Sequence, residues 1–271
     1  MEPGPALAGL PPSNNMGGNG VTGSRFDGSR VEFDSSEDVV LVQTAKRTKF
    51  VRVPRPDSGV SESAALVDQV SFTFRLDDLP LIWFTEADYV AALSPRLEAV
   101  FGFGVTLDRG RGLNFYESSF VLGDGWGHVC IGGQRDTCLV QLTGSGAMAA
   151  REGWERRLYD FLSNLPTARL TRVDLARDFF TGAYSVDQAF TDYMEGRFTC
   201  GGRRPTCEQR GNWVFPDGTG RTFYVGSRTS GKLARVYEKG KQLGGTACDL
   251  YPEWVRAELE LHSEDRIIPF D

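Results

Sequence analysis

Histidine is scarce in this chain, which has only His128 and His262 among its 271 residues. A zinc hydrolase centre or histidine-rich catalysis needs more of these ligands, so the sequence disfavours both classes. The sequence also lacks an apolar run of about 18 residues, which a membrane helix needs. It has no charged segment followed by an apolar one at its start, as a secretory signal would. Neither a membrane partner nor secretion is indicated, and a cytoplasmic protein is expected.

Cysteine is present, but in no pattern typical of a metal site. The five cysteines include no CxxC pair, and an odd number does not suit a complete set of disulfides. Cys200 and Cys207 are the nearest candidates for a zinc or disulfide element. Free thiols are the favoured interpretation, as is usual inside cells.

An excess of positive charge is missing as well, since the formal net charge is -6. This disfavours a uniformly basic nucleic-acid coat. A local basic groove beside an acidic metal site remains compatible, because steering depends on the distribution of charge. The chain is 40% hydrophobic and 11% aromatic, which is typical of a globular protein long enough to bury a core.

Residues 1–64 are expected to be a disordered or linker region. Residues 1–30 are rich in Gly, Pro, Ser and Asn and show no apolar period. A basic cluster between Lys46 and Arg55 is compatible with phosphate contacts, but a solvated linker is the favoured interpretation.

Two series of strands and helices follow, and each opens with a strand and then a helix. The first is predicted to contain strands at 70–74, 113–122, 127–131 and 137–142, a helix at 85–101 interrupted at Pro95, and a helix at 154–165. The second is predicted to contain strands at 170–180, 213–215, 221–226, 232–238 and 254–262, and a helix that is capped by Ser185 and ends just before Gly196.

A short internal match supports a duplication. An offset of 94 (224 minus 130) superposes residues 130–133 on 224–227 and places Thr143 on Tyr237. We therefore predict an α+β fold of two side-by-side units with an internal duplication. Each unit would be an antiparallel sheet with covering helices, at 65–166 and at 167–271. Because only the second unit has the tyrosine, it is expected to carry the chemistry, and the first to grip or shape the substrate.

Charged side chains are expected on one face of two strands of the second unit, at 170–180 and 254–262. Such a face is ordinarily the solvent side of a sheet, and a single carboxylate there is more often structural than catalytic. Their coincidence with a third strand that carries a tyrosine favours hard oxygen ligands for Mg²⁺ or Mn²⁺. The predicted ligands are Asp174 and Glu258 first, then Glu260 and Asp178.

Tyr237 is the predicted nucleophile, on a strand expected to continue to Lys239. A free phenol has a pKa near 10, so it needs nearby cations or a metal to ionise at neutral pH. Arg235 and Lys239, on the same face, are predicted to lower its pKa. The alternative role for Tyr237 is a cross-strand aromatic pair. The side chains predicted to bind phosphate groups are Arg172, Arg228, Lys232 and Arg256.

Four runs occur together and in order, at 170–178, 224–232, 235–240 and 254–260. This set resembles the replication initiation factor family of rolling-circle initiators. The family is found in filamentous phages and in plasmids related to the staphylococcal tetracycline-resistance type, and relaxases of conjugative elements also belong to it. The resemblance extends from about residue 65 to the end.

The resemblance implies a metal-dependent endonuclease that nicks one DNA strand at a replication origin. It would stay joined through tyrosine to the 5′ phosphate, free a 3′-OH for the host polymerase, and later rejoin the strand. The family's nucleophile matches Tyr237, and its acidic ligands match Asp174, Glu258 and Glu260. The expected partners are origin DNA, single-stranded at the nick, the host replication helicase and polymerase, and a second copy of the chain.

The sequence departs from this family in one respect. Members usually continue past an Arg-Ile-Ile-Pro segment, whereas this chain stops at Asp271, directly after residues 266–269. A truncated C-terminus is therefore expected. It leaves a non-catalytic DNA-binding or replication-control protein as one alternative, and a relaxase with the same chemistry as another. The absence of a two-histidine metal motif agrees with the acidic metal site of the family.

Overall fold

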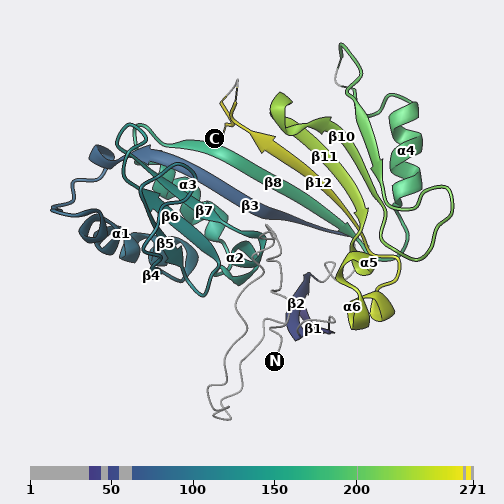
Figure 1. Ribbon diagram of the computed structural model, residues 1–271, viewed down its shortest axis with the longest axis horizontal. Coiled ribbons are helices and arrows are strands. Elements are labelled where there is room, and N and C mark those ends of the chain that lie inside the picture. Colours follow the sequence, from purple (N-terminus) through teal and green to yellow (C-terminus); the bar gives the residue numbers. More distant parts are fainter. Residues whose placement is uncertain (1–36, 44–47, 55–62, 200, 265–266, 270–271) are drawn as a thin grey trace, which may run out of the picture.

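Ten strands pair in one open antiparallel sheet, in the spatial order β4-β5-β6-β7-β3-β8-β12-β11-β10-β9 (Figure 1). The computed structural model describes residues 37–43, 48–54, 63–199, 201–264 and 267–269. The strands of the sheet are β3 (Ser63–Arg75), β4 (Val105–Asp108), β5 (Ser118–Leu122), β6 (Gly127–Ile131), β7 (Thr137–Leu142), β8 (Arg169–Phe179), β9 (Cys207–Arg210), β10 (Thr222–Ser227), β11 (Lys232–Glu238) and β12 (Val255–His262).

Helices and short 3-10 turns connect these strands. They are η1 (Leu76–Asp78), α1 (Glu86–Phe101), α2 (Gly144–Ala149), α3 (Trp154–Ser163), α4 (Val186–Met194), η2 (Arg228–Ser230), α5 (Lys239–Leu243) and α6 (Gly245–Leu250). Thr85 caps α1 in a capping box with Asp88, and Gly102 ends the helix in the left-handed conformation with φ 89°. The prediction of an interruption at Pro95 is wrong, because α1 continues through it with buried side chains on both sides.

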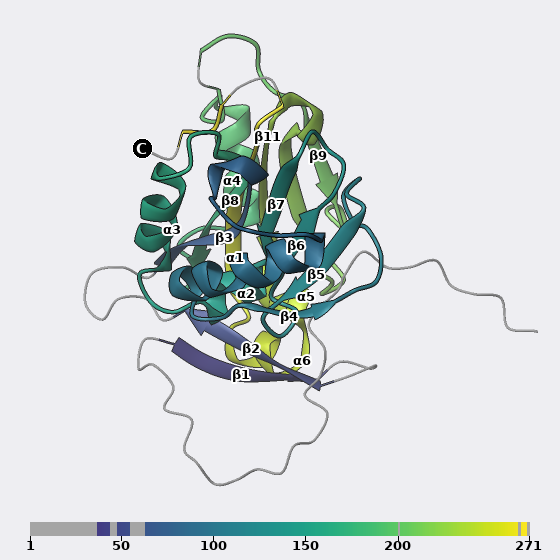
Figure 2. The same ribbon diagram turned by 90° about the vertical axis from the view of Figure 1, so that its left-hand side faces the viewer.

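The three longest helices cover the same face of the sheet. Helices α1 and α3 lie side by side (Figure 2) and pack on β3, where Val70, Phe72 and Phe74 are buried. Helix α4 packs its Val186 and Ala189 on apolar residues of β10 and β11. Cross-strand partners share a face, and the register carries this apolar face across the sheet through β8 and β12. The opposite face, called here the polar face, holds most of the polar and charged strand residues.

The same order of elements occurs twice. A strand and a helix are followed by four strands, and the first strand of each half pairs with the last. In this order β6 corresponds to β11 and β7 to β12. The predicted offset instead aligns the end of β6 with β10, so it is wrong by one strand. The error arises because neighbouring strands that end in glycines have similar sequences. The α+β class with antiparallel strands is confirmed, while an internal duplication stays a prediction.

The strands predicted for the two units meet in the middle of this single sheet. Strands β3 and β8 pair from Ser63 with Phe179 to Thr73 with Arg169. The register shifts twice along this seam, at Asp68 of β3 and at Thr171 of β8, where one strand has an extra residue. The second shift brings both Arg169 and Arg172 to the polar face, opposite Thr73 and Ser71.

Part of the predicted N-terminal linker forms a hairpin. Strands β1 (Glu37–Gln43) and β2 (Thr48–Pro54) pair in a two-stranded antiparallel sheet, and β1 lies against α6. The predicted disordered residues 1–30 lie outside the described residues. Within the described chain, no helix combines the length and the apolar character that a membrane span requires. Cys130, Cys138, Cys207 and Cys248 are free thiols, and Cys200 lies outside the described residues.

Two predictions for the second half are wrong. Residues 213–215 are not a strand, and the edge strand of this half is β9, inside a segment whose polar composition hid it. The strand that carries Tyr237 ends at Glu238, and Lys239 begins α5 rather than continuing the strand.

Candidate active site and its charged network

Tyr237 lies in a hydrogen-bonded cluster on the polar face of β11, and only 5% of its surface is exposed. Its hydroxyl donates a hydrogen bond of 2.5 Å to Glu258 Oε1 on the neighbouring strand β12. The Nζ of Lys239 donates to the same hydroxyl at 3.3 Å. Although Lys239 belongs to α5, its side chain returns to Tyr237, so the predicted contact forms without the predicted strand.

The pKa of Tyr237 is raised, contrary to the prediction that Arg235 and Lys239 would lower it. Burial is the largest cause, followed by the negative charge of Glu258, while Arg256 and Arg235 act in the opposite direction. The hydroxyl is therefore a neutral phenol that holds its proton against Glu258. Burial, followed by the charge of Arg256, lowers the pKa of Lys239 to about 8. Lys239 is thus still mostly charged at neutral pH.

Glu258 connects the tyrosine to the arginines. Its other oxygen, Oε2, accepts hydrogen bonds from the guanidinium of Arg235, which pairs with Glu258 across β11 and β12. The guanidinium of Arg235 also lies over the Tyr237 ring, 5.4 Å from its centroid. Both oxygens of this buried carboxylate are therefore engaged, one by the predicted nucleophile and one by a cation.

Glu260 and Asp174 form a second carboxylate pair beside the first. They are direct partners across β12 and β8, and both are buried. Arg172 bridges them, with Nη2 at 2.6 Å from Asp174 Oδ2 and 3.3 Å from Glu260 Oε2. Arg228 donates to Glu260 Oε1 at 2.8 Å, and the Nε2 of His262 lies 2.6 Å from the same oxygen.

The pKa of Glu260 reflects these contacts. Burial works to raise it, but the hydrogen bonds from Arg228 and His262 and the charge of Arg172 outweigh burial and lower it to about 2. Glu260 is ionised throughout the physiological range, as a ligand for a hard cation must be.

Asp178 is placed apart from the other predicted ligands. Its oxygens accept hydrogen bonds from Arg256 at 2.6 and 2.7 Å and from the Nε1 of Trp254 at 2.7 Å. The remaining Nη1 of Arg256 donates to Asp68 at 2.7 Å. Arg256 and Asp178, predicted to hold a phosphate and a metal, thus form a buried ion pair with each other.

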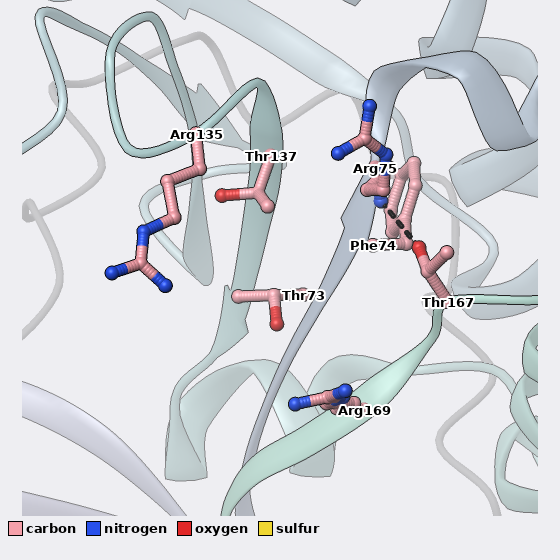
Figure 3. Close-up of a pocket in the computed structure, with 7 residues that line it drawn as sticks. All are labelled: Thr73, Phe74, Arg75, Arg135, Thr137, Thr167 and Arg169. Carbon is pink, nitrogen blue, oxygen red and sulfur yellow. Dashed lines mark hydrogen bonds between the residues drawn. The ribbon is translucent and has the colours of Figure 1, made fainter.

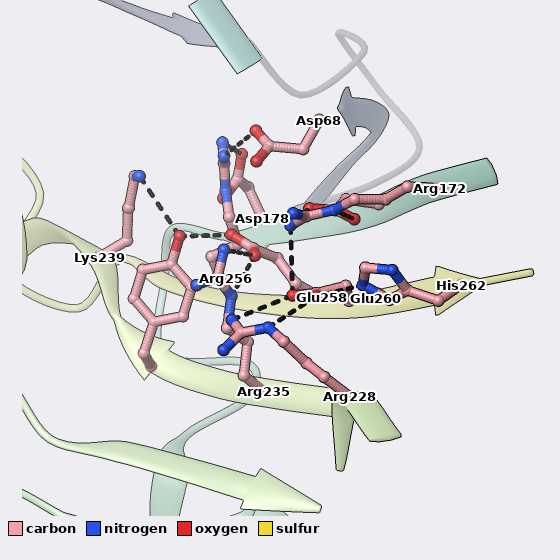
Figure 4. A network of polar contacts seen from close by, with 12 residues as sticks. Asp68, Arg172, Asp178, Arg228, Arg235, Lys239, Arg256, Glu258, Glu260 and His262 are labelled. Atoms are coloured by element: carbon pink, nitrogen blue, oxygen red, sulfur yellow. Dashed lines mark hydrogen bonds and ion pairs between the residues drawn. The ribbon is translucent and has the colours of Figure 1, made fainter. Parts of the chain in front are cut away.

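These residues make up one charged network (Figure 4). Its carboxylates and its cations are equal in number. The network consists of Asp68, Arg172, Asp174, Asp178, Arg228, Arg235, Tyr237, Lys239, Arg256, Glu258, Glu260 and His262. Of the predicted site residues, only Lys232 is missing from it. Lys232 is exposed, and strand alternation puts it on the opposite face from Arg235 and Tyr237.

The donor types in the network suit Mg²⁺ or Mn²⁺, but their arrangement offers no ready-made cage. No three His, Cys, Asp or Glu side chains are grouped so as to hold a metal ion, within the part of the chain that is described. The oxygens of Asp174 and Glu260 instead point at arginine hydrogens. Binding of a cation between these two carboxylates requires Arg172 to turn away.

Sequence reasoning missed Asp68, a member of the network, and Trp254, which donates a hydrogen bond to Asp178, and it assigned no role to His262. Asp68 lies 188 residues from Arg256 in the chain, and the register shift that aims it there has no local signal. Trp254 is the first residue of the last predicted strand and was treated as apolar. The sequence does not indicate that its indole nitrogen donates to Asp178. The alternation that placed Glu260 on the polar face also placed His262 beside it, so this contact was within reach.

Comparison with known proteins adds a family match and a structural match. Residues 168–271 match the family model described as replication initiation factor. The fold is similar to the structure of the rolling circle replication initiator protein from Geobacillus stearothermophilus, with a TM-score of 0.54, 21% sequence identity and 74% of each chain covered. No curated protein matches the chain. The resemblance to the replication initiation factor family is confirmed, and the matched residues include Tyr237 and the strands β8 to β12 of its network.

Proposed function

We propose, from the family match of residues 168–271, that this protein is a replication initiator that acts by rolling-circle chemistry. It would nick one DNA strand at an origin through a 5′-phosphotyrosine intermediate and later rejoin the strand. The observation that carries the proposal is the hydrogen bond from the Tyr237 hydroxyl to the buried carboxylate of Glu258, with Arg235 and Lys239 beside it. A tyrosine placed against a base and cations is the arrangement that nucleophilic attack on phosphorus requires.

Glu258 acts as the general base in this proposal. When the Tyr237 oxygen bonds to phosphorus, its proton passes along the existing hydrogen bond to Glu258. The bond from phosphorus to the 3′ oxygen breaks, and that oxygen takes a proton from solvent to become the free 3′-OH. Rejoining runs the same step backward, with the 3′-OH as nucleophile, the phenolate as leaving group and Glu258 returning the proton.

The cations of the network have two tasks. Lys239, 3.3 Å from the phenol oxygen, stabilises negative charge on that oxygen while it is deprotonated. Arg235 and Arg172 line the same face and supply guanidinium donors for the non-bridging oxygens of the phosphate. Each is bound to a carboxylate in the free protein, so phosphate binding exchanges one anionic partner for another.

A divalent cation belongs to the same proposal. Glu260 and Asp174 are the residues we assign to Mg²⁺ or Mn²⁺, because they are direct cross-strand partners held by the partly exposed Arg172 and Arg228. Glu258 instead serves as the base, and Asp178 is paired with the buried Arg256. When bound, the ion would polarise the phosphodiester and draw off developing charge. The proton transfers described above use Glu258 and solvent, and none of them passes through the ion.

The partners follow from the resemblance to the family. They are origin DNA with a single strand at the nick, the host replication helicase and polymerase, and a second copy of the chain. No surface among the described residues is assigned to the helicase, the polymerase or the second copy. The same chemistry would serve a relaxase, and the difference lies in which DNA the protein recognises.

The test uses a supercoiled plasmid that carries the candidate origin, incubated with Mg²⁺ or Mn²⁺. Wild-type protein is expected to produce open circles and to become attached to a 5′ end. Tyr237→Phe should lower this activity by roughly a thousandfold or more, since the variant has no nucleophile. Tyr224→Phe is the matched control, because Tyr224 lies on the adjacent strand and faces Arg235. Nicking that survives in Tyr237→Phe but not in Tyr224→Phe would move the nucleophile to Tyr224. DNA binding without nicking would identify a non-catalytic binding protein.

A further inference from the structure

A basic pocket of about 270 Å³ lies at the end of the sheet seam that is far from Tyr237 (Figure 3). Strands β3, β7 and β8 and the loops at their ends form it. Three arginines line the pocket, together with threonines that include Thr73 and Thr137. Arg135 and Arg169 lie on either side of Thr73 (Figure 3).

The arginines of this pocket differ in what they already bind. Arg75 makes a two-pronged ion pair with the exposed Asp77. Arg135 and Arg169 are exposed, and neither guanidinium has a hydrogen bond or an ion pair among the described residues. This contrasts with the charged network, where carboxylates hold the guanidinium groups. The pocket therefore offers two free cations to an anion from outside.

A strained turn presents Arg135 to the pocket. Gln134, Arg135 and Asp136 have φ values of 43°, 58° and 58°, three consecutive left-handed residues without a glycine among them. This conformation is unfavourable for residues other than glycine. Hydrogen bonds from Leu76 N to Asp136 O and from Thr137 Oγ1 to Gln134 O hold the turn in place. Strain of this kind, fixed by surrounding structure, is concentrated at functional sites.

The pocket and Tyr237 share the polar face of the sheet. Thr73 pairs with Arg169, and Ser71 pairs with Arg172 of the network. Because Thr171 is an extra residue in β8, Arg169 and Arg172 lie on the same face of the sheet, next to each other along the strand. Arg169 and Asp178 are nine positions apart on this strand, which corresponds to about 30 Å at roughly 3.3 Å per residue. The cross-strand partner of Ser71 in β7 is Gln141, which is also uncharged, so the paired positions of β3, β7 and β8 between the pocket and Arg172 carry no carboxylate.

We propose that this pocket binds a backbone phosphate of the DNA strand whose reacting phosphate lies at Tyr237. Free guanidinium groups with a neighbouring hydroxyl are the donors that contact phosphate oxygens and fix the register of a strand without reading its bases. The inference rests on the proposed function for the identity of the anion. The first half of the sheet then positions the strand that the second half cuts.

The experiment measures single-stranded DNA binding in the Tyr237→Phe background, so that it does not depend on nicking. The probe is a fluorescein-labelled oligothymidylate of 16 nucleotides, and anisotropy gives Kd at several salt concentrations. The test variant carries Arg135→Gln and Arg169→Gln. The control is Arg96→Gln, which removes one positive charge away from the pocket, because Arg96 is exposed on α1, which covers the opposite face.

Loss of two phosphate contacts should lower the slope of log Kd against log salt by about 1.4, and at 0.1 M salt should weaken binding on the order of tenfold. Arg96→Gln should leave both values unchanged. Replacing Arg135 and Arg169 by lysine keeps the charge and should preserve the slope. An unchanged slope in the glutamine variant, or an equal loss in Arg96→Gln, would overturn the pocket alone. Absence of binding by the parent protein would overturn the proposed function together with the pocket.

Discussion

The two halves of the sheet repeat one order of elements, yet their polar faces differ in chemistry. In the second half, β11 presents Arg235 and Tyr237, and acids and cations of the network neutralise one another. In the first half the corresponding strand β6 presents His128 and Cys130 to the same face. Burial, the largest cause, lowers the pKa of His128 and raises the pKa of Cys130 to about 11, so neither is charged at neutral pH.

The two halves differ in whether their polar face contains buried charges. Buried charges are tolerated in the second half because each has a partner of opposite sign. The first half carries no buried charge on this face, and its polar atoms include Ser71 Oγ and His128 Nδ1, which are buried without a hydrogen-bond partner among the described residues. The same backbone plan therefore supports a buried charged network in one half and a neutral surface with free cations at its end in the other.

The largest expected effect of changing a residue of the network is on the nicking rate. Glu258→Gln keeps the shape of the side chain but removes its ability to take the proton of Tyr237. Removal of a general base typically costs about a hundredfold to ten-thousandfold, and we expect the nicking rate to fall within that range. The measurement is single-turnover formation of the covalent complex. A rate within threefold of wild type would show that Glu258 is not the base.

The next effect is on stability. Arg256→Met leaves Asp178 and Asp68 buried or part-buried without their cation, and is expected to lower the free energy of unfolding by about 3–5 kcal/mol. Ser71→Ala is the matched change in the first half. It removes a buried hydroxyl that has no partner, so it should change stability by less than about 0.5 kcal/mol. Urea unfolding measures both, and similar losses in the two variants would contradict the contrast.

Metal binding sharpens the comparison further. We expect Mn²⁺ to bind the wild-type protein without DNA and Glu260→Gln to weaken that binding at least about tenfold. Electron paramagnetic resonance of free Mn²⁺ reports the binding without any activity measurement. Glu98→Gln, an exposed change on α1, should have no effect. If wild type binds no Mn²⁺, Glu260 and Asp174 serve only as partners of the arginines.

The smallest effect is a pH dependence. The pKa of Lys239 is about 8, below its ordinary value, so this cation loses its proton as pH rises through 8. The nicking rate should then fall by a few fold between pH 7 and 9. Lys239→Arg stays charged over this range and should abolish the fall. The pKa of Tyr237 is raised and does not enter this window. A decline that persists in Lys239→Arg would assign it to another group.

Much of the second half was predictable from local pattern. Alternation alone placed Asp174, Glu258, Glu260 and Tyr237 on one face, and each lies there. The pairing of arginines with these carboxylates was not predictable, because it depends on which strands are neighbours. Strand β12 inserts between β8 and β11, and no feature of the sequence fixes that order.

The same limit explains why the predictions of a lowered pKa for Tyr237 and of a strand that continues to Lys239 were wrong. Arg235 and Lys239 are close to Tyr237 as expected, but burial of the phenol and the facing Glu258 have the larger effect. The sequence near Tyr237 contains neither piece of information. Lys239 was assigned to a strand because α5 has only five residues, too few for a helical period to show.

The seam between β3 and β8 bears on how such proteins can be recombined. The two predicted units divide at residues 166 and 167, where an exchange of parts would ordinarily be attempted. Here that cut would separate β3, 13 residues long, from its partner β8 and expose a long unpaired edge to aggregation. It would also separate Arg256 from its partner Asp68. A hybrid protein must therefore inherit β3 and β8 from one parent, which makes the seam, rather than either half, the unit of inheritance.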